Sequence, residues 1–115
     1  MAVSTYMKNA VLDAFFGVGA VMMSLHTADP GTSGANEVSG GSYARQQVSY
    51  GSASAGQIKN IATATFTNLP AGTITHAGFW KNDQFCQGAA LTASRTVLAG
   101  DGLYFSADNI AHLVS

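Results

Sequence analysis

The chain has 115 residues and a formal net charge of −1, and its length is typical of a single domain. Only 10% of the residues are charged, against about a quarter in an average soluble domain, and the five basic residues are scattered. This composition argues against a disordered chain and against a basic nucleic-acid surface, and it indicates a surface that contacts other protein.

The N-terminal part of the domain, residues 1–17, is predicted to form one short amphipathic helix. Met7, Val11 and Phe15 recur at helical spacing between residues 4 and 16. A hydroxyl residue at the start can cap the first turn, and the glycine after residue 16 can end the helix. A helix of this length is marginal alone, so we expect it to need tertiary packing or a partner chain.

Residues 18–115 change to short β-favouring runs separated by Gly, Ser, Pro and Asn. The predicted strands are residues 21–27, 43–50, 58–66, 74–81, 85–91, 95–98, 103–106 and 110–114. About eight short strands at even spacing predict a mainly β, single-domain antiparallel β-sandwich of jelly-roll type, with the helix added at its N-terminus.

A polar stretch at residues 28–42 is too long for an ordinary hairpin and is predicted to be a functional loop or an assembly arm. Asp29 stands at its start. Glu37 and Arg45 bracket a glycine pair and could form an ion pair across the base of the loop. For this pair we favour a structural role, in loop geometry or in a contact between subunits, over ligand binding.

No arrangement of residues marks a catalytic, cofactor or metal site. Cys86 cannot pair within the chain and is expected to be a buried, inert thiol. His26, His76 and His112 lie far apart in the sequence, so each is expected to be a core or strand-edge histidine with a hydrogen-bonded ring. We therefore expect no enzyme activity, no metal and no cofactor.

The longest mostly apolar run, residues 18–25, is too short to span a bilayer. No signal peptide is visible either. From the residues alone we expect no membrane contact, and synthesis in the cytoplasm of the producing cell.

Three blocks of sequence carry a family resemblance. The first joins LHTADPG at residues 25–31 to GANEVSGGSYARQ at 34–46, the second is FTNLPAGTITHAGF at 66–79, and the third joins GAALTASRTV at 88–97 to GDGL at 100–103. These blocks closely resemble a family of small tailed-bacteriophage virion proteins, commonly labelled tail fibre or minor tail proteins.

The resemblance implies a β-rich structural subunit that is made in the bacterial host cytoplasm and built into the virion. Its expected partners are other virion proteins, such as major capsid or tail subunits, and further copies of itself, for example in a trimer. Two placements fit: a capsid decoration or cement protein, and a minor tail or tail-fibre-like subunit. The assembly interface is expected to include Met7, Val11, Phe15, Asp29, Glu37 and Arg45.

A receptor- or glycan-binding module of the phage tail is the alternative. Tyr43, Tyr50, Trp80 and Phe85 could form a stacking platform for a sugar. The simpler interpretation places Trp80 on a core strand, packed inside.

Overall fold

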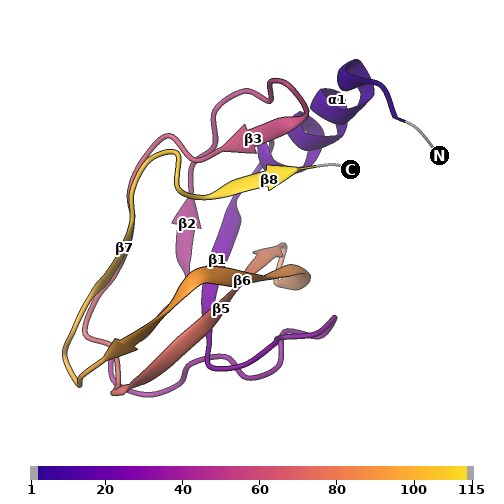
Figure 1. Ribbon diagram of the computed structural model, residues 1–115. Helices are drawn as coiled ribbons and strands as arrows, with labels where there is room; N and C mark the ends of the chain where they lie inside the picture. Colours follow the sequence, from indigo (N-terminus) through magenta and orange to yellow (C-terminus); the bar gives the residue numbers. More distant parts are fainter. Residues whose placement is uncertain (1–2, 114–115) are drawn as a thin grey trace.

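The structure is a computed structural model, and it describes residues 3–113 (Figure 1). The elements are α1 (Thr5–Phe16), β1 (Val21–His26), β2 (Gln46–Val48), β3 (Gln57–Lys59), β4 (Ala64–Phe66), β5 (Gly72–Lys81), β6 (Gln84–Val97), β7 (Leu103–Phe105) and β8 (Ala111–Leu113). Every pair of neighbouring strands is antiparallel. The predicted mainly β fold with eight strands and one N-terminal helix is therefore confirmed.

The strands form one four-stranded sheet, in the order β2-β1-β5-β6, and two two-stranded sheets, β3-β8 and β4-β7. Figure 1 shows α1 beside the β3-β8 pair at one end of the molecule, and β5 and β6 crossing the other end. The hydrophobic core lies on one face of the large sheet, where Met23 of β1 and Phe79 of β5 pack with Phe66 of β4 and Ile110 before β8.

Strand β1 is buried on both faces. Val21, Met23 and Leu25 point into the core, whereas Ser24 and His26, which alternate with them, are also fully buried. Another part of the chain must therefore cover the second face, and the long loop between β1 and β2 does so.

Several strand boundaries differ from the prediction. The predicted strand at 43–50 forms a strand only from Gln46 to Val48, with an isolated bridge from Tyr50 to Asn60 beyond it, and the predicted strand at 58–66 is two strands, β3 and β4. The break follows from Asn60, whose buried amide donates to the carbonyls of Ala62 and Ser106, so the chain turns there. Residue 114, the end of the last predicted strand, lies outside the described residues.

The two strands predicted at 85–91 and 95–98 are one strand, β6, with an irregularity between them. Ile74 pairs with Arg95 and His76 pairs with Ala90, so residues 91–94 bulge out opposite Thr75. A bulge keeps the strand continuous while it interrupts the ladder, and this is why the sequence pattern breaks there.

Candidate functional site

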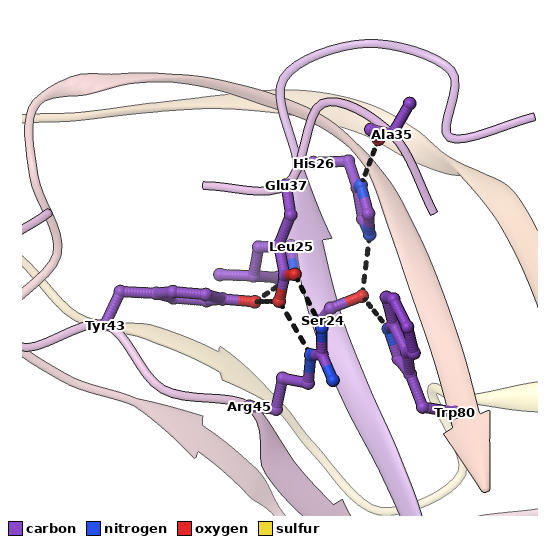
Figure 2. A network of polar contacts seen from close by, with 8 residues as sticks. All are labelled: Ser24, Leu25, His26, Ala35, Glu37, Tyr43, Arg45 and Trp80. Carbon is purple, nitrogen blue, oxygen red and sulfur yellow. Dashed lines mark hydrogen bonds and ion pairs between the residues drawn. The ribbon is translucent and has the colours of Figure 1, made fainter. Parts of the chain in front are cut away.

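Three features of the fold could carry a function: a polar network under the long loop, an aromatic cluster around His112, and the outer face of α1. The polar network, drawn in Figure 2, lies on the second face of β1. Trp80 Nε1 donates to Ser24 Oγ (2.8 Å), and Ser24 Oγ lies 2.6 Å from His26 Nε2. His26 Nδ1 lies 2.7 Å from the carbonyl of Ala35, which can only accept, so Nδ1 carries the proton and Ser24 donates to Nε2.

The second half of this network is the predicted ion pair, and the prediction that these two residues meet is confirmed. Arg45 binds Glu37 through two parallel hydrogen bonds of 2.9 Å, and Tyr43 donates to the same carboxylate at 2.7 Å. Burial raises the pKa of Glu37, but the bonds from Arg45 and Tyr43 outweigh burial and leave that pKa below its usual value. The guanidinium also lies 3.5 Å from the centre of the Trp80 ring, so it joins both halves of the network.

The network fixes the loop against the sheet. Pro30 is buried, and the backbone of Val38 bonds to Leu25 of β1. Asp29 shapes the turn at the start of the loop, because its carboxylate accepts from the amide of Gly31 at 2.9 Å. The loop is thus packed on its own sheet through these contacts, and the Glu37–Arg45 pair sets loop geometry within the chain.

We expect the Glu37–Arg45 pair to stabilise the loop by about 1–2 kcal/mol, since it is bidentate and half-buried. Arg45→Lys should lose most of this free energy, because an ammonium can neither bind both oxygens nor stack on Trp80. Urea unfolding of Arg45→Ala, Glu37→Ala and the double variant gives the coupling energy. A coupling energy near zero would show that the pair contributes nothing to the fold.

The pair of Ser24 and His26 has the hydrogen bond of a nucleophile and its base, but its surroundings exclude that use. Both side chains are 0% exposed, and the serine oxygen that would attack a substrate already accepts a hydrogen bond from the Trp80 indole. A substrate cannot reach them. The structural role of Ser24 was not predicted. Its signal in the sequence is that Ser24 and His26 are polar residues on alternate positions of an otherwise apolar strand, and both lie opposite β5.

The aromatic cluster joins α1, β5, β6 and β8 around a buried histidine. The ring of His112 stacks on Phe16 with 3.9 Å between centroids and meets the edge of Phe79. Its Nε2 lies 2.7 Å from the Tyr50 hydroxyl, and its Nδ1 lies 2.9 Å from Gln87 Oε1. Burial lowers the pKa of His112 to about 4, so the ring is neutral at pH 7. The expectation of core histidines with bonded rings is confirmed for His112, as it is for His26.

The predicted helix contacts the fold through Leu12, through Phe16 and through a flank of polar side chains. Its polar face lies against the fold: Asn9 accepts from the amide of Gly56 at 2.9 Å, and Asp13 accepts from the amide of Ala53 at 2.8 Å. A second apolar face, opposite Leu12, is exposed. We call this face the α1 stripe, and it consists of Tyr6, Met7, Ala10, Val11 and Ala14.

Of the three helix residues predicted for assembly, Met7 is 53% and Val11 is 46% exposed, so both belong to the stripe. Phe15 is half-buried beside Lys81 and Phe16 of the same chain, at the edge of the stripe. Leu12 is the helix residue that enters the interior.

The remaining candidates are dispersed. The expectation that Cys86 is buried is wrong, since its thiol is exposed on β6, where side chains alternate out of an edge strand. Tyr50 belongs to the His112 cluster, whereas Tyr43 and Trp80 belong to the loop network, so the four aromatic residues form no common platform. Trp80 is half-buried, with its ring edge to face with Phe85.

Over residues 3–113, no group of three or more His, Cys, Asp or Glu side chains gathers where it could hold a metal ion. In that same range no helix is both long and apolar enough to cross a bilayer.

The comparisons with known proteins agree with a phage origin. A family described as podophage GP4 fiber I protein gp80 matches residues 2–112. The search of curated proteins finds no match. Because the match spans nearly the whole chain, the protein belongs to this family of podophage fibre proteins.

Proposed function

We propose that this fibre-family protein is a non-enzymatic virion subunit that acts by protein–protein assembly, with the α1 stripe as its principal contact surface. One observation carries the proposal: Leu12, Phe16 and two polar side chains hold the helix to the fold, while a second apolar face, the α1 stripe, points outward. A helix in a monomeric protein normally buries its apolar side. We therefore interpret the outward apolar stripe as a surface that another chain covers.

The stripe is rigid before any partner arrives. Ser4 caps the first turn, the bonds of Asn9 and Asp13 fix the middle, and Phe16 stacks on His112 at the end. A preorganised surface loses little conformational entropy on binding, so a modest apolar area gives useful affinity. Many copies in one particle then add their contacts by avidity.

The family description favours a fibre or minor tail position over capsid decoration. On this proposal the protein is made in the host cytoplasm and joins other virion proteins and further copies of itself, for example as a trimer. Copy number separates the two placements. We expect tens of copies per particle or fewer for the fibre, by quantitative mass spectrometry of purified virions, and hundreds would indicate capsid decoration.

Val11→Asp tests the proposed function, because it places a charge in the centre of the stripe. Since Val11 is 46% exposed, we expect the free energy of unfolding to change by less than about 1 kcal/mol. Incorporation into virions should fall at least tenfold, because binding would bury an unpaired carboxylate. The measurement is the amount of variant protein in particles produced by complementation of a phage that lacks the gene.

The matched control is Leu98→Asp, at an apolar residue that is 70% exposed and lies outside the stripe. It should incorporate as the wild type does. Equal incorporation of both variants would refute the stripe as the assembly surface. A point substitution is preferable to deleting residues 1–17, because that deletion also removes buried Leu12 and the Phe16 ring from the fold.

A further inference from the structure

A groove of about 650 Å³ runs along one side of the molecule between β6 and the segment that carries β7 and β8. We call it the β6 groove. Its lining combines polar side chains, such as Gln87, Thr92 and Asn109, with apolar ones: Ala89, Leu91 and Ala93 of β6, Leu103 and Phe105 of β7, and Ile110 before β8. Arg95 is the one Lys, Arg, Asp or Glu side chain among the described residues that line it. Tyr104 and Leu113, which also line it, are 66% and 67% exposed, so apolar surface remains open to solvent here.

An added β-strand is a poor occupant for this groove. Strand β6 is the outer strand of its sheet, but its ladder with β5 shifts register twice, beside Cys86 and at residues 91–94. Bulges twist an edge away from further pairing, and only residues 87–90 keep a regular run between them. Side-chain docking against the apolar lining is therefore favoured over strand addition.

The chain itself carries a surface of matching character, the α1 stripe. Met7, Val11 and Ala14 recur at the i, i+4, i+7 spacing with which a helix enters an apolar groove. The stripe is uncharged, so its docking would bury no unpaired charge in a groove that is almost uncharged as well. Alanines on both surfaces allow close approach. The helix is about 18 Å long at 1.5 Å per residue, which suits a groove bounded by residues 87–95 of β6.

The stripe cannot enter the groove of its own chain. Asn9 and Asp13 hold the opposite face of the helix to the backbone at Gly56 and Ala53, and Phe16 stacks on His112. Turning the stripe inward would break all of these contacts. The stripe can therefore enter only the groove of a second copy.

We propose that the α1 stripe of one copy docks in the β6 groove of the next, and this inference rests on the proposed role of the stripe in assembly. Stripe and groove are different surfaces, so the contact is head-to-tail. It repeats from copy to copy until it closes a ring or continues as a filament. The self-association expected from the charge-poor composition then has a defined geometry.

Disulfide trapping tests the contact. In a Cys86→Ser background, which removes the exposed native thiol, Val11→Cys places a thiol on the stripe and Ala93→Cys places one in the groove. The two variants are mixed, oxidised mildly, and resolved by non-reducing electrophoresis with peptide mapping. We expect the mixture to give at least five times more cross-linked dimer than either variant alone. The chain with both substitutions should give cross-linked trimers and larger species.

Three results would overturn the inference. Cross-linking of Ala93→Cys alone, as efficient as in the mixture, would show that β6 edges pair with each other. The same result for Val11→Cys alone would show that two stripes pair. No cross-link in the mixture, together with a monomeric mass by light scattering at high concentration, would show that no second copy binds.

Two variants distinguish a failure of this docking contact from a failure of the proposed function. Ala93→Arg fills the groove and leaves the stripe intact, whereas Val11→Asp damages the stripe. If both variants lose incorporation into virions and the mixture cross-links, both statements stand. If Ala93→Arg incorporates normally while Val11→Asp does not, the stripe still binds a virion protein, but its partner is not the groove of a second copy.

Discussion

Gly78→Ala should destabilise the protein by about 3 kcal/mol or more and lower its melting temperature by about 12 °C or more. Gly78 lies on β5 directly opposite Ser24 of β1. A Cβ atom there would lie 2.5 Å from Ser24 Oγ and 2.6 Å from His26 Nε2. Both groups are fully buried and hydrogen-bonded, so neither can move without breaking the network under the loop.

The matched control for this variant is Gly72→Ala on the same strand. A Cβ at Gly72 meets nothing within 4 Å, so the same chemical change there should cost less than about 1 kcal/mol. Thermal unfolding followed by circular dichroism compares the two variants. Equal melting temperatures would mean that the loop network can rearrange, and that the close packing of Gly78 against Ser24 does not hold the loop.

Local signals were sufficient to predict the helix and the strands β1 and β5. A hydroxyl cap and the glycine at residue 17 mark the two ends of α1, and turn residues around Pro70 mark the start of β5. The charges at Glu37 and Arg45 also predicted their own contact, because a loop that returns to its sheet brings its two ends together.

The face on which the helix packs could not be predicted from its own residues. The apolar pattern of α1 does not distinguish Leu12, which enters the core, from Met7 and Val11, which face outward. That choice depends on two backbone amides, of Ala53 and Gly56, that bind the polar side chains of the helix. Those amides lie some 40 residues further along the chain, in a turn whose position depends on the tertiary fold. The same argument applies to β6, since its bulge is defined only against Thr75 of the paired strand.

Acid should destabilise the protein through His112. Burial lowers the pKa of this ring to about 4, whereas a histidine in the unfolded chain keeps a pKa near 6.5. Between these values the unfolded state binds a proton that the folded state does not, so the free energy of unfolding falls as the pH falls. From pH 7 to pH 5 the loss from this residue should be about 2 kcal/mol, and it should level off below pH 4.

His112→Gln removes the titrating ring, so the free energy of unfolding of this variant should change little from pH 7 to pH 5. It should be lower than that of the wild type at pH 7, because the stack on Phe16 is lost. Glu37 contributes stability in a lower pH range, because its pKa lies below the ordinary value of 4.5. The stability that this carboxylate contributes is therefore lost only as the pH falls below 4.5. Urea unfolding at pH 7, 6 and 5 measures how the free energy of unfolding changes with pH. A wild-type slope in His112→Gln would show that another group accounts for the acid sensitivity.

Because His112 contacts Phe16 of α1 and Gln87 of β6, its protonation should loosen the stripe and the groove together.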